Sequence, residues 1–234
     1  MKLLIQNQEK IYQPILARRV TLTLSRQGSP GMLEFEVVKD GVIDFQEGNM
    51  VMFYGEEGEY FRGYVFTKKR SRWDETILVT AYDQMRYLKN HATFLYPQMK
   101  ASELVEMIAK QYRLKTGQIA DTKIQLTGRI EENRSLFDII DYALEETKIL
   151  GGGSFVLYDK QGELTLTEDE AFDTRICLSV GDAGEYDYRT TIDDGVYSRV
   201  MLYSTDLKQQ GAAPAVFTNE EAAKKWGILQ YRCV

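Results

Sequence analysis

The chain offers few residues whose chemistry could support catalysis. His91 is the one histidine among 234 residues. Most general acid–base, triad and metal sites depend on a histidine at a defined position. We interpret His91 as a polar residue that closes the first domain. We therefore predict no catalytic residue, no metal site and no cofactor.

Two carboxylate doublets are the remaining candidates for acid–base chemistry. They are Glu131 with Glu132, and Asp193 with Asp194. A glycosidase needs two acidic side chains that face each other across a cleft. Adjacent residues on a strand or helix point in different directions, so these doublets suit solvated turns or caps better. A glycosidase is therefore the weakest of three functional hypotheses.

Two further motifs lack the context that their chemistry requires. The Gly-Gly-Gly-Ser run at 151–154 follows a predicted helix and precedes a predicted strand. A phosphate-binding loop has the opposite order, so we interpret this run as the end of a helix. Cys177 and Cys233 lie in apolar runs without metal-ligand spacing, which favours buried free thiols and excludes a disulfide framework.

The single basic run of the chain is a candidate protein interface. One interpretation is a solvated turn whose charges also discourage aggregation between strand edges. A second is a contact with an acidic neighbouring subunit, anchored by a tryptophan. A local DNA contact is the third. The candidate residues are Lys68, Lys69, Arg70, Arg72 and Trp73.

Composition favours an ordinary soluble globular protein with much β structure. Hydrophobic residues make up 44%, charged residues 27% and aromatic residues 12% of the chain. The net charge of −6 argues against general nucleic-acid binding, which needs a basic face. The apolar stretch at the N-terminus is too short for a secretory signal, and no later run approaches a membrane span. We expect synthesis and folding in the cytoplasm, without membrane insertion.

Residues 1–97 are predicted to form a small antiparallel β-barrel or sandwich. Apolar and polar residues alternate in several short runs, as on strands with one buried face. Glycine-containing turns separate these runs. An amphipathic segment with Met85, Tyr87 and Leu88 follows the last run. The predicted strands cover residues 19–23, 32–38, 50–54, 60–67 and 76–82.

Residues 98–168 are predicted to form an α+β domain. One helix carries Leu104, Met107, Ile108 and Tyr112 on a single face and ends before Gly117. A second helix starts at a capping sequence, with Ser135 followed three residues later by Asp138. A short strand within 123–130 connects the helices, and a hairpin within 155–166 follows them.

Residues 169–234 return to a strand pattern and are predicted to begin a second β-barrel. Thr218 is the predicted N-cap of a short helix, and Gly227 is the residue that ends it. We expect this barrel to be truncated, because the closing run is strand-like. The predicted strands cover residues 176–180, 185–190, 197–205 and 228–234.

Several sequence blocks together resemble the XkdQ-type, or YqbQ-type, baseplate hub proteins of contractile phage tails and tail-like bacteriocins. The longest block is residues 60–90, and it includes the basic run. Secretion spikes of the VgrG type resemble the chain more distantly. The other blocks are SLFDIIDYALEET from Ser135, FVLYDKQGELTLTE from Phe155, YSRVMLYS from Tyr197 and EEAAKKWGILQY from Glu220.

This resemblance implies a structural protein and not an enzyme. It implies a homotrimeric hub in which two small β-barrels per subunit alternate around a channel, with the tail tube on one side and the spike on the other. It also implies a LysM-like helix-containing unit inserted between the barrels, in a β-rich α+β fold. A LysM-like unit raises the second hypothesis, a carbohydrate-binding module for peptidoglycan. The implied location is the baseplate of a virion or tail-like particle.

Overall fold

The computed structural model describes residues 1–172, 189–203 and 213–233. The chain divides into two units, Met1–Thr174 and Arg175–Val234. The predicted strand at 176–180, most of the predicted strand at 185–190 and Cys177 lie outside the described residues.

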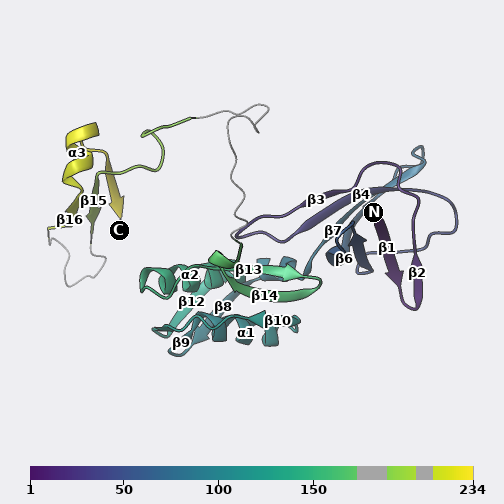
Figure 1. Cartoon of the computed structure of the whole chain (residues 1–234), viewed down its shortest axis with the longest axis horizontal. Coiled ribbons are helices and arrows are strands. Elements are labelled where there is room, and N and C mark those ends of the chain that lie inside the picture. The colour runs from purple at the N-terminus through teal and green to yellow at the C-terminus, as the bar shows by residue number, and fades with distance from the viewer. Residues whose placement is uncertain (173–188, 204–212, 234) are drawn as a thin grey trace. The chain divides into compact units, whose positions relative to one another are not determined.

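An antiparallel sheet of seven strands forms the first part of unit 1 (Figure 1). Its spatial order is β2-β1-β5-β6-β7-β4-β3. No ladder pairs β2 with β3 in the described part of the chain, so the sheet is open and not a closed barrel. The strands are β1 (Lys2–Asn7), β2 (Lys10–Tyr12), β3 (Thr21–Thr23), β4 (Met32–Val38), β5 (Met50–Tyr54), β6 (Glu59–Lys69) and β7 (Thr76–Tyr82).

The alternating residues that predicted these strands also build the core of the sheet. In β4, Leu33, Phe35 and Val37 are buried, whereas Glu34 and Glu36 are partly exposed. Buried side chains from β1, β5, β6 and β7 join them in one hydrophobic cluster. The strands predicted at 32–38, 50–54 and 76–82 are confirmed. Strands β1 and β2 were not predicted from the sequence.

The second part of unit 1 packs two helices against three small sheets (Figure 1). Strand β10 lies parallel to β14, and β13 pairs antiparallel with β14 on its other side. The pairs β9 with β11 and β8 with β12 are antiparallel. The elements are η1 (Gln84–Lys89), β8 (His91–Tyr96), β9 (Met99–Lys100), α1 (Ala101–Gln111), β10 (Thr116–Ile119), β11 (Gln125–Leu126), β12 (Arg129–Ser135), α2 (Leu136–Ile149), β13 (Phe155–Lys160), β14 (Glu163–Glu168) and η2 (Asp169–Phe172).

The start of α2 follows directly from the sequence. The Ser135 Oγ accepts a hydrogen bond from the Asp138 amide at 3.1 Å, which satisfies one of the free N–H groups of the first turn. The hydroxyl in turn donates to the Asp138 carboxylate at 2.6 Å. The predicted cap is therefore confirmed.

The apolar faces of α1 and α2 close a second hydrophobic cluster. Leu104 and Ile108 from α1 and Ile139 and Ile140 from α2 are almost fully buried there. Met85 and Leu88 of η1 belong to this second cluster and not to the core of the first sheet. Unit 1 therefore contains two separate cores. The predicted division of its residues into domains at residue 97 stays a prediction.

The described residues of unit 2 form a three-stranded sheet and one helix. Its order is β16-β15-β17, and β15 runs parallel to β17. The helix begins one residue later than predicted: the Asn219 side chain, not that of Thr218, accepts the bond from the Ala222 amide at 3.0 Å. Gly227 ends the helix as predicted. The elements are β15 (Arg199–Leu202), β16 (Ala215–Thr218), α3 (Glu220–Trp226) and β17 (Gln230–Cys233).

Burial differs sharply between two leucines on strands in the second part of unit 1, and this gives a test of the fold. Leu164 on β14 is fully buried, whereas Leu95 on β8 is 71% exposed. We expect Leu164→Ala to lower the free energy of unfolding by about 2–5 kcal/mol, through lost burial and the cavity left behind. Leu95→Ala, the matched control, should change it by less than about 0.5 kcal/mol. Urea unfolding of both variants measures the difference; equal losses would contradict this account of the core.

Candidate functional site

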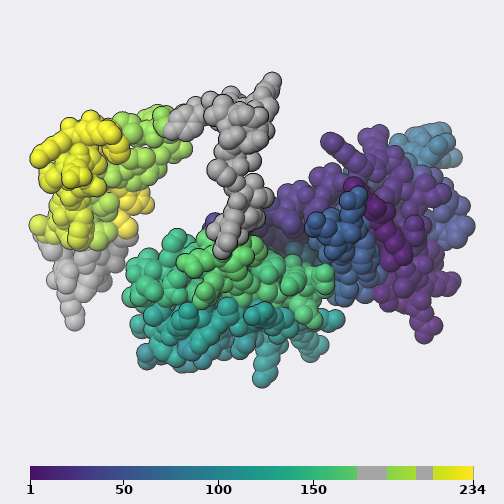
Figure 2. Space-filling model, in the orientation of Figure 1, coloured from purple at the N-terminus to yellow at the C-terminus, as the bar shows by residue number. Residues whose placement is uncertain are grey.

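The predicted basic run lies at the tip of the β6–β7 hairpin. Lys68 and Lys69 are the last residues of β6, and residues 70–75 form the loop to β7. The tip projects from the end of the first sheet (Figures 1 and 2). Among its candidate residues, Lys69, Arg70, Arg72 and Trp73 are exposed.

Lys68 differs from the other candidates because its ammonium group interacts with another segment of the same sheet domain. Its Nζ donates a hydrogen bond to the carbonyl of Phe45 and lies 4.6 Å from the centre of the Phe45 ring. Phe45 itself is buried in the core of the first sheet. Lys68 therefore fastens the segment between β4 and β5 to the hairpin, and we remove it from the candidate interface.

Lys39, which was not predicted from the sequence, holds the loop in place. Its Nζ donates to the carbonyl of Ser71 at 2.7 Å and to that of Asp74, and its amide donates to the carbonyl of Glu75 at 2.8 Å. These bonds fix the loop backbone from a neighbouring segment. No sequence signal links Lys39 to a loop more than 30 residues away.

Trp73 and Arg72 are exposed and lie next to each other in the loop. The Trp73 side chain is 84% exposed, and the Arg72 guanidinium lies 5.4 Å from the centre of its ring. Tryptophan and arginine are the residue types that most often dominate the binding energy of protein interfaces. A large exposed aromatic group on a fastened loop is costly to hydrate and loses little entropy on binding.

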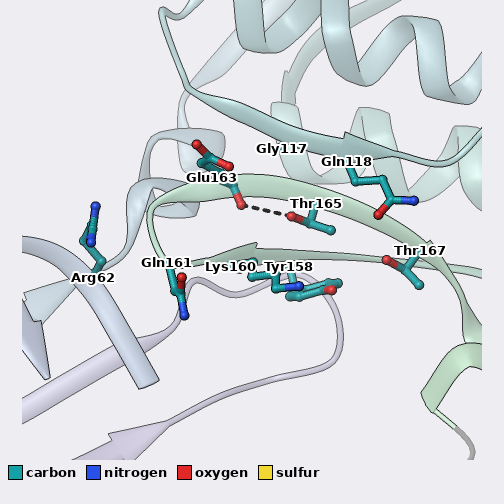
Figure 3. A pocket seen from close by; sticks show the side chains of 9 residues that line it. All are labelled: Arg62, Gly117, Gln118, Tyr158, Lys160, Gln161, Glu163, Thr165 and Thr167. Atoms are coloured by element: carbon teal, nitrogen blue, oxygen red, sulfur yellow. Dashed lines mark hydrogen bonds between the residues drawn. The ribbon is translucent and has the colours of Figure 1, made fainter. Parts of the chain in front are cut away.

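A polar pocket of about 340 Å³ lies on the outer face of the β10-β14-β13 sheet (Figure 3). Tyr158 and Lys160 extend from β13, Gln118 comes from β10, and Arg62 of β6 lies near the β13–β14 turn. The opposite face of this sheet carries the leucines of the second core. The other lining residues are Gly117, Gln161, Glu163, Thr165 and Thr167.

The walls of this pocket carry hydroxyl, amide and charged groups on fixed strands. Arg62 is oriented by two bonds to the Glu59 carboxylate, at 2.6 and 2.8 Å. The Tyr158 ring packs edge-on against Phe172, with ring centres 5.5 Å apart. Small-molecule sites are usually lined mainly by apolar groups, so this pocket suits a polar, hydroxyl-rich ligand better.

The residues considered for catalysis do not converge. Glu131 is buried and its carboxylate lies 3.1 Å from the Arg134 guanidinium, whereas Glu132 is exposed. Asp193 and Asp194 are exposed in a turn of unit 2. His91 is exposed at the start of β8. Within the described ranges, no three His, Cys, Asp or Glu side chains form a group that could hold a metal ion.

The glycine run and the described cysteine have structural roles in place of chemical ones. Gly151 and Gly153 follow α2 with positive φ angles of 83° and 97°, as expected for the end of a helix. Cys233 on β17 is a free thiol, and it is half-buried where the sequence favoured full burial. None of the helices in the described residues is long and apolar enough to cross a membrane.

The whole chain superimposes on solved prophage tail proteins. The 43 kDa tail protein of prophage MuSo2 from Shewanella oneidensis matches with a TM-score of 0.72 at 14% identity, over 100% of this chain and 73% of that one. A tail protein of Neisseria meningitidis MC58 matches with a TM-score of 0.66 at 11% identity, over 100% and 71%. The fold is therefore one that prophage tail proteins share.

Sequence similarity then identifies the family. The model of the YqbQ-like family matches residues 20–233, so the chain belongs to this family. The PBSX phage-like element protein XkdQ of Bacillus subtilis is 29% identical over 229 residues, and YqbQ of the same organism is 27% identical over 224. In both cases the match covers 93% of this chain and 67% of the relative.

The different roles of the tip residues give a stability prediction. We expect Trp73→Ala to leave the free energy of unfolding within about 0.5 kcal/mol of the parent, because its side chain packs on little else. Lys68→Met should lower it by about 1 kcal/mol, because the Phe45 carbonyl loses its donor. Thermal unfolding of both variants measures this; a larger loss for Trp73→Ala than for Lys68→Met would contradict the assignment.

Proposed function

We propose that this chain is a non-enzymatic structural protein of a phage tail or phage tail-like bacteriocin, and that it works as a baseplate hub subunit. The observation that carries the proposal is the fold shared over the whole chain with prophage tail proteins. The relation to XkdQ of a phage-like element supports it. In the described residues, the candidate catalytic groups remain apart.

In this proposal the protein acts through interfaces and not through a reaction. Three copies form a ring around a channel, and the ring joins the tail tube to the central spike and other baseplate proteins. Heterologous contacts between copies close such a ring when the rotation between subunits is one third of a turn. The open seven-stranded sheet and the strands of unit 2 would supply the two β domains of each subunit, and the helix-containing part would be the LysM-like unit between them. Assembly would take place in the bacterial cytoplasm before incorporation into the particle.

The hairpin tip is the surface that we assign to a neighbouring subunit. Trp73 would anchor the contact, while Lys69, Arg70 and Arg72 would face an acidic surface. The chain carries a net charge of −6. The basic tip of one copy is therefore attracted to the acidic remainder of a second copy. Long-range attraction of this kind favours encounter of the correct partners.

Reversal of charge at the tip tests the interface. We expect the double variant Arg70→Glu, Arg72→Glu to weaken trimer formation and binding to the tail tube protein by at least about tenfold, since attraction becomes repulsion. Sedimentation of the full-length protein, alone and with the tail tube protein, measures both. Lys110→Glu with Lys148→Glu is the control, because it changes the net charge equally on exposed helix positions away from the tip.

Two results would contradict the proposal at different levels. A parent protein that stays monomeric at high concentration and does not bind the tail tube would contradict the hub. Equal weakening by the tip variant and the control variant would contradict only the role of the tip.

The pocket on the β10-β14-β13 sheet favours a second candidate function, binding of a glycan such as peptidoglycan. Its hydroxyl and amide groups can exchange hydrogen bonds with sugar hydroxyls, and the Tyr158 ring offers an apolar surface to a sugar face. Glycan binding is compatible with the proposed location in the baseplate, because that end of the tail contacts the bacterial cell wall.

Retention on purified peptidoglycan distinguishes the two candidates. Glycan binding predicts that the parent chain is retained and that Gln118→Ala with Thr167→Ala reduces retention at least about fivefold, through lost hydrogen bonds. Gln111→Ala with Thr127→Ala is the control, since both residues are exposed outside the pocket. A pure hub predicts no retention of any variant.

A further inference from the structure

The two ends of strand β6 carry exposed groups of opposite charge. The turn of residues 55–58 precedes β6, and the loop of residues 70–75 follows it. Because β6 is eleven residues long, the turn and the loop are about 35 Å apart, at ~3.3 Å per residue. The loop of one copy therefore cannot reach the turn of the same copy.

Glu56 and Glu57 make the turn the acidic end of β6. Both side chains are exposed, and a hydrogen bond of 2.8 Å from the Gly55 amide to the Gly58 carbonyl closes the turn that holds them. The ion pairs formed among the described residues include neither glutamate. Lys2 of β1 lies at the same end of the sheet, and the two glutamates outnumber it. The turn therefore presents an excess of negative charge on a fixed backbone.

An exposed aromatic ring lies beside this turn. Tyr60 is 47% exposed, and its ring lies so close to Gly55 that a Cβ atom on that residue would be 2.0 Å from it. The ring also packs edge-on against Phe53, with ring centres 6.4 Å apart. Tyr60 is therefore an oriented apolar surface next to two negative charges.

The other end of β6 has the complementary composition. Its exposed cations, Lys69, Arg70 and Arg72, outnumber the two acidic residues of the loop. The ion pairs of the described part of the chain do not include these cations. Trp73 supplies an exposed aromatic ring here. Each end of β6 thus combines a ring with charges, and the sign of the charges is opposite.

Several other acidic pairs of the chain already have cationic partners. Glu131 is paired with Arg134, and Glu168 with Lys123. The glutamates that begin α3 precede two lysines by one helical turn, the spacing at which opposite charges attract on a helix. The exposed aspartates at 193–194 are an alternative acidic pair, and the test below includes them.

We propose that the basic loop of one copy docks on the acidic turn of the next copy, with Trp73 against Tyr60 and the arginines against Glu56 and Glu57. This inference rests on the assembly of several copies proposed above, and it names the surface that receives the tip. The loop and the turn are different surfaces, so the contact is heterologous and each copy can use both ends of β6 at once.

The rings and the charges contribute to this contact in different ways. Exposed ion pairs add little affinity on their own, because water and salt screen them. Contact between Trp73 and Tyr60 removes apolar surface from water and supplies most of the attraction. The charges orient the copies, since two loops or two turns repel each other whereas a loop and a turn attract.

Exchange of charge between the two surfaces tests the contact, and sedimentation of the full chain measures self-association. We expect Glu56→Arg with Glu57→Arg to weaken self-association at least about tenfold, as for Arg70→Glu with Arg72→Glu, because like charges then face each other. The variant that carries all four changes should recover to within about threefold of the parent, since the attraction is restored with its direction reversed. All four side chains are exposed, so we expect each variant to fold.

The matched control combines Arg70→Glu and Arg72→Glu with Asp193→Arg and Asp194→Arg, which makes the same change in net charge, and we expect no recovery. A parent that does not associate with itself would contradict the proposed assembly, and this inference with it. If the parent associates, a four-change variant that stays weak, or a control that recovers, would overturn only this inference.

Discussion

Burial of apolar side chains in unit 1 is divided between two cores, and this division determines how the remaining features are arranged. The first core lies on one face of the seven-stranded sheet, and the second is enclosed by α1, α2 and the β13–β14 hairpin. Because neither core extends into the other, polar contacts help to connect the two parts, among them the hydrogen bond from Gln161 to Glu59 and the ion pair of Arg26 with Asp169.

The helices and strands that depend on residues close together in the sequence could be predicted from local patterns. Alternation identified β4, a run rich in aromatic and β-branched residues identified β7, and the pair of Ser135 with Asp138 identified the start of α2. Strand β10 escaped prediction because it is only four residues long, is mostly exposed and pairs in parallel with β14, nearly 50 residues away. The cap of α3 was misplaced by one residue, since Thr218 and Asn219 are both good capping residues and backbone geometry decides between them.

The candidate site was less predictable because its properties depend on distant contacts. The sequence alone revealed the basic run. It could not show that Lys68 is hydrogen-bonded to the carbonyl of Phe45, or that Lys39 is hydrogen-bonded to the loop backbone. The polar pocket combines residues of β6, β10, β13 and β14, and no motif unites them. The scarcity of histidine was, by contrast, readable from composition, because His91 is the one histidine in the sequence and histidine-based chemistry needs that residue type. Together these features favour a protein that functions by its surfaces.

The central claim is that the chain occupies the centre of a tail baseplate as one of three equivalent subunits. A cryo-electron microscopy reconstruction of the tail particle that contains this protein tests the claim most directly. The account predicts three copies around the tail axis, between the tube and the spike, with the 70–75 loop at a contact between subunits. Particles in which the protein is missing, or in which it decorates the periphery with this loop in solvent, would contradict it.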